Sequence, residues 1–351
     1  MVQKLYTESY IEDIADSIRA KNGTNNTYTV AQMSGAIDNL PLELPADTCL
    51  GHSQWTTVPS SIRFTPRSSW SYMFYMCSDL TTIPLIDTGT ATDFSYMFDE
   101  CISLASVPLL DTSSAINMSH MFGHCESLAT IPLLDTSSVQ DISSMFIDCL
   151  SLESVPLLDT SSVTNMYQMF AGCQLLTTVP LFNTSSVTSM ERMFYSCIEL
   201  TSVPQLNFGN VQNTSRMFGD CSSLATLPSF SLSSATNIAN MFNSCTSITS
   251  VDMSNTGLVT HMSGLFDGCT ALTTVPVLDM DSVTNLSRTF NSCSSLSSAS
   301  LQNILKSLLT AVAYTGTKTL RQLGLTRAQT TTCTGFTEWA TLSSDGWTTG
   351  Y

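Results

Sequence analysis

One cysteine recurs at a fixed interval over most of this 351-residue chain. The series consists of Cys77, Cys101, Cys125, Cys149, Cys173, Cys197, Cys221, Cys245, Cys269 and Cys293, so that each number exceeds the previous one by 24. Only Cys49 and Cys333 fall outside it. A fixed period of this length is typical of a solenoid, in which each coil places its residues over the equivalent residues of the coil before. Such a chain buries its apolar residues by stacking similar coils.

Other apolar residues share the period. A Phe stands three residues before each Cys, usually after a Met, and a Leu or Ile follows the Cys by three. No coil can bury this set alone, so we expect the coils to share one core. In the first six coils the predicted core residues are Phe74, Cys77, Phe98, Cys101, Phe122, Cys125, Phe146, Cys149, Phe170, Cys173, Phe194 and Cys197.

The cysteine column favours free thiols over disulfides or a metal. Stacked equivalent side chains point the same way instead of toward each other, which does not suit a disulfide. The sequence contains no CxxC pair of the kind that zinc sites use. We therefore predict buried, reduced thiols that behave as small hydrophobic side chains.

Each coil contains three recognisable parts. The phrase "LxxVPLL" predicts a strand, "DTSS" a turn begun by Asp or Asn, and "VTNMxxMFxxC" a helical or 3₁₀ return segment. A Pro, such as Pro108, recurs inside the strand and cannot donate to a ladder, so the strands should be very short. The predicted fold class is an α/β solenoid, leucine-rich-repeat-like, with about ten 24-residue coils, short parallel strands, a small helical N-terminal module and a C-terminal cap.

The chain divides into four predicted segments. These are a helical attachment or oligomerisation module at 1–46, an N-terminal cap at 47–72, the solenoid at 73–297 and a C-terminal cap at 298–351. In the module, Ile11, Ile14, Ala15 and Ile18 would share one helix face, Gly23 would end that helix and Thr29 would cap a second. In the C-terminal cap, an amphipathic helix would bury Leu301, Ile304, Leu305, Leu308 and Leu309.

The charge distribution excludes several partners. Between Met73 and Leu296 there are 19 acidic and three basic residues and no Lys, which accounts for the whole net charge of −16. Nucleic acid and anionic membranes are therefore not expected partners. No apolar run reaches the ~18 residues of a membrane span, so no membrane insertion is expected. The N-terminus lacks the apolar region of a signal peptide, which predicts a protein made in a cytoplasm.

No catalytic motif is present, and we expect neither an enzyme nor a cofactor. His120 and His124 are four residues apart and could pair on a metal with Asp99 or Glu126, but surface polar residues are the favoured interpretation. Stacked carboxylates of the "DTSS" turns could bind calcium. The weak calcium candidates are Asp111, Asp135 and Asp159. Asn and Ser stand at this position in other coils, which favours side chains that cap their own turns.

An aromatic cluster stands at the start of the solenoid. Trp70, Tyr72 and Tyr75 lie within "SSWSYMFYM" and could stack on a sugar ring. The favoured interpretation is that they cover the open end of the core.

The repeat "VTNMxxMFxxCxxLxxVPxLDTSS" resembles the bacterial surface-protein class of leucine-rich repeat over residues 71–297. The N-terminal "YIEDIADSIRAKNGTNNTYTVAQMSGAIDNLP" resembles a module of phage tail-fibre and baseplate proteins, and "WATLSSDGW" is similar to the ends of phage leucine-rich-repeat proteins. These resemblances imply a phage virion structural protein (tail fibre, baseplate or head fibre) that adheres to the host surface. The alternative is a bacterial surface adhesin or a secreted protein-interaction solenoid.

The same resemblances imply the partners and the location. Residues 1–46 would contact other virion proteins, and the solenoid would bind a bacterial surface protein or glycan. We expect a homo-oligomer, with a trimer favoured, located in the virion after assembly in the host cytoplasm.

Overall fold

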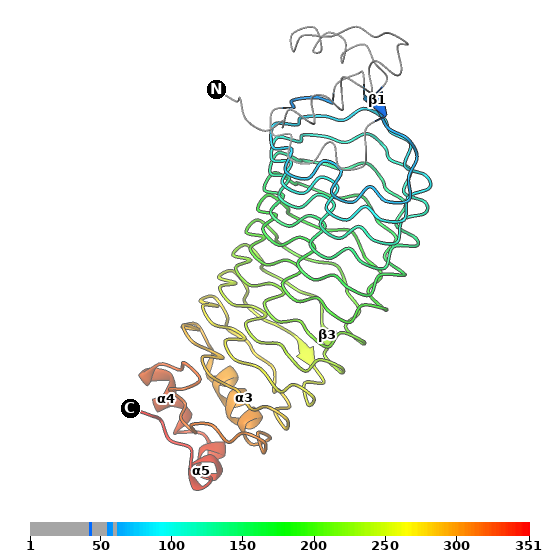
Figure 1. Ribbon diagram of the computed structural model, residues 1–351. Helices are drawn as coiled ribbons and strands as arrows, with labels where there is room; N and C mark the ends of the chain where they lie inside the picture. Colours follow the sequence, from blue (N-terminus) through cyan, green and yellow to red (C-terminus); the bar gives the residue numbers. More distant parts are fainter. Residues whose placement is uncertain (1–41, 44–54, 59–61) are drawn as a thin grey trace, which may run out of the picture.

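The computed structural model describes residues 42–43, 55–58 and 62–351. They form an elongated stack of coils that ends in three helices (Figure 1). Two pairs of parallel strands are present: β1 (Leu42–Glu43) with β2 (Ile62–Arg63), and β3 (Phe230–Ser231) with β4 (Met253–Ser254). The helices are α3 (Ser298–Leu308), α4 (Arg327–Cys333) and α5 (Thr337–Ser344). Apart from β1, the predicted module at 1–46, including its helix residues and caps, lies outside the described residues.

Adjacent coils are joined through the segment that we predicted to be a helical return. Nine isolated parallel bridges link ten equivalent residues, from Ser69 to Asn285. After the bridge, successive backbone N–H groups donate alternately to the next coil and to their own coil. The Phe98 N–H donates to the Met121 carbonyl of the next coil at 2.9 Å, whereas the Cys101 N–H donates to Phe98 in its own coil at 3.0 Å. The prediction of a helical or 3₁₀ segment was wrong, because this segment is a run of turns whose ladder runs from coil to coil.

The alternation depends on backbone conformation. Two residues in each coil, four positions apart, have a positive φ, as at Tyr96 (58°) and Glu100 (62°). A left-handed residue reverses the course of the chain and so prevents a continuous helix. It costs a non-glycine residue roughly 1–2 kcal/mol, which the bonds between coils offset. Glycine removes that cost at Gly172, Gly264 and Gly268.

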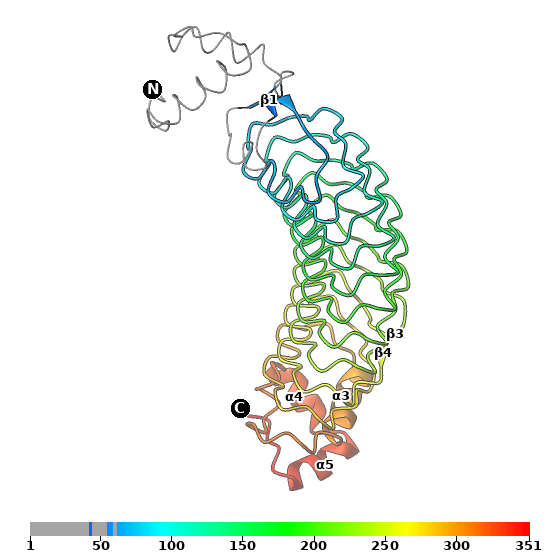
Figure 2. The ribbon, with the colours of Figure 1, turned by 45° about the vertical axis from the view of Figure 1, so that its right-hand side comes forward.

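The "LxxVPLL" segment lies on the opposite side of the stack from these turns, where Figure 2 shows β3 and β4. Short parallel pairings occur here, as predicted, but among the described residues they are limited to β1–β2, β3–β4, Thr57–Thr82 and Ser250–Thr274. In the other coils, buried threonine side chains join one coil to the next. The Thr112 hydroxyl donates to the Asp135 carbonyl at 2.9 Å, for example. The main ladder therefore belongs to the turns and not to the predicted strand.

The phenylalanine column forms a continuous stack of rings in the core. Ring centroids of neighbouring coils lie 5.3 Å apart at Phe74–Phe98 and 5.8 Å apart at Phe266–Phe290. All ten rings are buried. This confirms the periodic core that the sequence predicts.

The cysteine column is also buried, and the nine cysteines from Cys101 to Cys293 are free. Each of these thiols donates to the carbonyl of the Phe in the preceding coil, as Cys173 does to Phe146 at 3.1 Å. The same carbonyl also accepts the N–H of the Cys in its own coil, Cys149. Burial raises the pKa of each of these nine thiols, to about 12 at Cys293. A small side chain that is apolar and still donates one bond suits this position.

Helix α3 closes the far end of the solenoid. Its hydroxyl side chains accept hydrogen bonds from the edge of the last coil, from Val275 N–H to Ser300 at 3.1 Å and from Leu278 N–H to Ser307 at 2.8 Å. Four of the five predicted buried residues are buried, namely Leu301, Ile304, Leu305 and Leu308. Leu309 was predicted wrongly, because it caps the helix C-terminus and is 40% exposed.

Candidate binding surfaces on the solenoid

The predicted aromatic cluster divides between the core and the surface. Trp70 is fully buried, with its ring 5.6 Å from Phe64 and the Arg67 guanidinium 4.7 Å from its centroid. It therefore serves the core, as the end-capping interpretation predicts, and is not available to a ligand. Tyr72 is 42% exposed and Tyr75 is half-buried. These two rings meet edge to face, with their centroids 5.5 Å apart.

Tyr72 begins a surface stack that sequence analysis missed. Its ring is parallel to that of Tyr96, 4.7 Å away, and Tyr96 in turn stacks on His120 at 4.4 Å. All three occupy the first left-handed position of their coils; Tyr72 is exposed, whereas Tyr96 and His120 are half-buried. We call Tyr72, Tyr96 and His120 the aromatic column. The available signal was their spacing of one full repeat, which places them in one column although they are far apart in the chain.

His124 lies beside the aromatic column at the second left-handed position of its coil. Its Nδ1 is 2.9 Å from the buried carboxylate of Asp99, and its Nε2 is 3.5 Å from Asp148. The bond to Asp99 raises the pKa of His124, whereas burial lowers the pKa of His120. The two histidines therefore face different environments. Among the described residues, no group of three or more His, Cys, Asp or Glu side chains is arranged to hold a metal ion.

The calcium candidates act within their own turns. The carboxylate of Asp135 accepts the N–H of Ser137 at 3.0 Å and its hydroxyl at 2.7 Å, and these bonds lower the pKa of Asp135. Asp111 and Asp159 accept the equivalent N–H bonds, and their pKa values are lowered in the same way. Asn183 forms the same turn without a charge. The column is therefore a set of side-chain caps.

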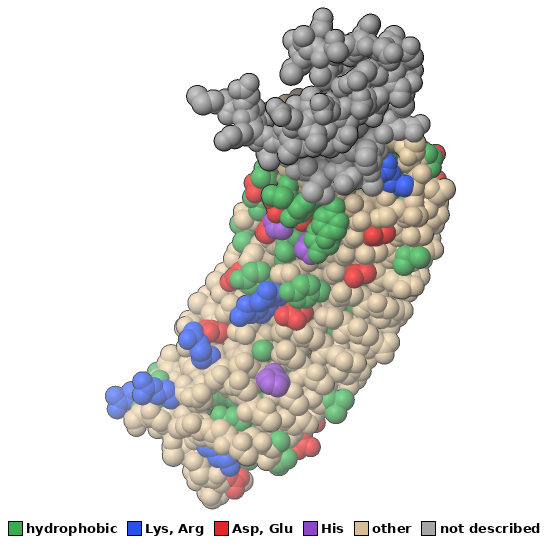
Figure 3. Space-filling view, in the orientation of Figure 1, with side chains coloured by type: hydrophobic (Ala, Val, Ile, Leu, Met, Phe, Trp, Pro, Cys, Tyr) green, Lys and Arg blue, Asp and Glu red, His purple; other side chains and the backbone are tan. Residues whose placement is uncertain are grey.

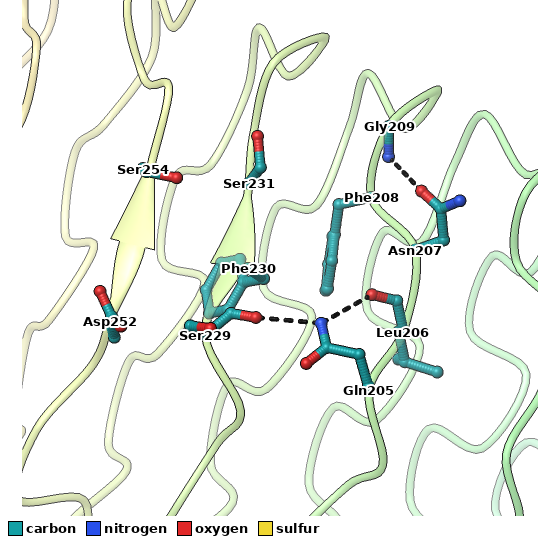
Figure 4. A pocket seen from close by; sticks show the side chains of 10 residues that line it. All are labelled: Gln205, Leu206, Asn207, Phe208, Gly209, Ser229, Phe230, Ser231, Asp252 and Ser254. Carbon is teal, nitrogen blue, oxygen red and sulfur yellow. Dashed lines mark hydrogen bonds between the residues drawn. The ribbon is translucent and has the colours of Figure 1, made fainter.

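A shallow groove of about 660 Å³ interrupts the opposite side of the stack (Figure 4). In most coils a threonine bridges to the next coil here, but Phe208 and Leu232 take its place in two adjacent coils. The Gln205 side chain crosses the gap and donates to the Ser229 carbonyl at 2.9 Å. The sequence signal for the groove is the loss of the turn threonine from two consecutive repeats, between Thr184 and Thr256.

Hydrophobic, acidic and histidine side chains gather at the N-terminal end of the described stack (Figure 3). Most of the rest of that view is neither charged nor hydrophobic. This contrast follows from a composition with only 11% charged residues, against about 25% in typical proteins. In later coils the position of the aromatic column is occupied by residues of other types, among them Gln168, Arg192 and Arg216.

Stacked parallel coils and a shared core, with two short two-stranded sheets among the described residues, define a repeat solenoid. One family model matches at residues 68–175, 150–253 and 236–306; its description is Mycoplasma protein of unknown function, DUF285. The matches together span more than half of the chain, so the chain belongs to this family. A search of curated proteins gave no match. None of the helices in the described part of the chain is long and apolar enough to cross a membrane.

Similar solved structures include leucine-rich repeat proteins of three bacteria. The protein from Bacteroides ovatus is 20% identical, with 73% of this chain and 75% of that chain covered and a TM-score of 0.41. The protein from Eubacterium ventriosum is 17% identical, with coverage of 69% and 77% and a TM-score of 0.39. The T. pallidum protein is 21% identical, with coverage of 62% and 76% and a TM-score of 0.30.

Proposed function

We propose that this protein is a non-enzymatic recognition solenoid that adheres to a bacterial surface glycan through the aromatic column. The observation that carries the proposal is the stack of Tyr72, Tyr96 and His120 on an otherwise hydroxyl-rich surface. Aromatic side chains combine apolar contact area with polar tips, which suits the C–H and O–H groups of a sugar. The column is fixed in place by the coils beneath it, so binding requires little reordering of the protein.

Acidic groups beside the column supply the polar part of the proposed site. Glu100 lies 3.5 Å from the Tyr75 hydroxyl, and the carboxylate of Asp148 is about half exposed next to His124. Carboxylates accept hydrogen bonds from sugar hydroxyls, whereas they repel anionic polymers. The proposed ligand is therefore a neutral or amino-sugar surface glycan.

We expect the double variant Tyr72→Ala/Tyr96→Ala to lose glycan binding by about tenfold or more, equivalent to ~1.4 kcal/mol or more. Binding of the full chain to an array of bacterial surface glycans measures this, followed by titration of the best ligand. The matched control is Tyr195→Ala, which removes a half-buried surface tyrosine from another coil. Equal losses in the control and the double variant would contradict the assignment of the site, as would unchanged binding in the double variant.

The proposed biological context is a phage virion, as a tail fibre, baseplate or head fibre protein. It is supported by the sequence resemblance of residues 1–46 to phage tail modules and by a solenoid whose exposed columns are suited to adhesion. In this proposal residues 1–46 join other virion proteins or sister subunits, with a trimer favoured. A bacterial adhesin or secreted interaction solenoid is the alternative, because the repeat also resembles the leucine-rich repeats of bacterial surface proteins.

A further inference from the structure

The outer side of the "LxxVPLL" segment carries a column of leucines that the fold leaves exposed. In five consecutive coils the residue after the Pro is Leu, and the next residue, such as Leu110, is buried. The exposed fractions are 76% at Leu85, 62% at Leu109, 61% at Leu133, 63% at Leu157 and 60% at Leu181. A contiguous row of exposed apolar side chains is unusual on a monomer and marks a place of interaction.

A row of carboxylates runs beside the leucines. In an extended segment, residues two positions apart point to the same side, about 7 Å from each other. Leu109 and Asp111 are related in this way, and both are exposed. The four adjacent acidic residues are Asp87, Asp111, Asp135 and Asp159. We call the five leucines and these four aspartates the leucine–aspartate face.

This face has a defined length and repeat. The row of carboxylates ends where Asn183 replaces the Asp, and the row of leucines ends one coil later, where Gln205 replaces the Leu at the groove. The step between these five coils, taken at the core rings beneath the face, is 5.3 to 5.7 Å. An α-helix laid along the solenoid axis repeats its faces every ~5.4 Å, which matches this step. An extended strand places same-side residues ~6.6–7 Å apart, which does not match.

We propose that the leucine–aspartate face binds a cationic amphipathic helix of a partner protein. Apolar side chains of that helix lie between the leucines, and its Lys or Arg residues lie over the aspartates. Charge complementarity selects this occupant, because the four carboxylates stand side by side with no basic residue in the same segments of their coils. A second copy of the chain would bring a second acidic row to the interface. An anionic membrane would be repelled in the same way.

The probe is a synthetic helical peptide of about 18 residues with Leu at i, i+4, i+7 and i+11 and Lys along one flank of that stripe. Its binding to the full chain is measured by fluorescence anisotropy at several salt concentrations. We expect binding that weakens as salt rises, because the Asp–Lys contacts are screened. A peptide with Glu in place of Lys should not bind.

Two sets of substitutions separate the apolar and charged contributions. Leu109→Thr/Leu133→Thr/Leu157→Thr should reduce peptide binding by about tenfold or more, as expected for anchor residues. Asp111→Asn/Asp135→Asn/Asp159→Asn should weaken binding less and remove most of its salt dependence. Asn keeps the turn intact, as Asn183 shows. The matched control is Leu175→Thr, which changes a leucine that is 47% exposed outside the face.

Unchanged peptide binding in the triple Leu variant would overturn the proposal, as would equal binding of the Glu peptide. A lower oligomer mass in the Leu variant, with peptide binding retained, would assign the face to a second copy of the chain and would also overturn it. Circular dichroism of each variant shows whether the solenoid is intact. The triple Asp→Asn variant should retain every turn. Its loss of salt dependence therefore still tests the proposal if the triple Leu→Thr variant unfolds.

Discussion

Phe170→Ala is expected to destabilise the protein by ~3–5 kcal/mol, because it removes a fully buried ring from the middle of the core stack. Phe170 stacks on Phe146 at 5.5 Å and on Phe194 at 5.7 Å, so two interfaces between coils lose contact at once. In a solenoid each coil is stabilised mainly by its neighbours. The loss should therefore extend into the adjacent coils and not stay at the substituted residue.

Chemical denaturation and amide hydrogen exchange measure this effect. Exchange should accelerate around Cys149 and Cys197, in the coils on either side of the substitution. Phe170→Leu is the control, because it fills more of the same space and should cost less than Phe170→Ala. Normal protection in both neighbouring coils of Phe170→Ala would contradict the stacked register described above.

Removal of residues 1–40 is expected to convert an oligomer into a monomer that still binds its glycan. The proposed attachment module has no repeat, and the pair of amphipathic helices predicted for it is too small to be stable alone. It needs a partner surface, which sister subunits or the virion would supply. The deletion stops at residue 40 because β1 (Leu42–Glu43) pairs with β2 and so belongs to the cap of the solenoid.

Light scattering coupled to size exclusion gives the oligomer mass of the full and shortened chains. The double variant Ile14→Asp/Ile18→Asp, which changes two residues of the predicted apolar face, should lower the mass in the same way without shortening the chain. If the mass is unchanged after the deletion, the attachment role is wrong. If glycan binding disappears while the solenoid stays folded, the proposed separation of attachment from recognition fails.

Much of the core could be predicted from sequence because a solenoid repeats its buried positions. The fixed period of the repeats identified Phe170 and Cys173 as members of buried columns, and the structure confirms this. The period also predicted short parallel pairings, and helical periodicity predicted four buried residues of α3. The position of a residue within the repeat is sufficient to predict whether it is buried, because each coil repeats the environment of the coil before it.

Backbone conformation could not be predicted in the same way. Tyr96, His120 and Ser144 all adopt a positive φ, although residue type does not require it. The apolar spacing in this segment suits a helix equally well, and only the bonds between coils decide against it. The donor role of the cysteines was missed for a related reason, because the accepting carbonyl belongs to the preceding coil.

The binding surfaces were predicted least well. Proximity along the chain groups Trp70, Tyr72 and Tyr75, whereas the structure buries Trp70 and places Tyr96 and His120 in one column with Tyr72. Function in a solenoid lies in columns that cross coils, so the relevant neighbours are one full repeat apart in the chain. Both the aromatic column and the leucine–aspartate face become visible when the repeats are aligned on their cysteines.

The stacked register on which these surfaces depend is tested most directly by thiol labelling, read by mass spectrometry for each cysteine. In the native protein, the nine cysteines from Cys101 to Cys293 should resist a maleimide, because they are buried and their pKa values are raised. After denaturation without a reductant, all nine should react. Rapid native labelling within the column, or disulfide-linked peptides from equivalent positions, would contradict the proposed stacking of coils.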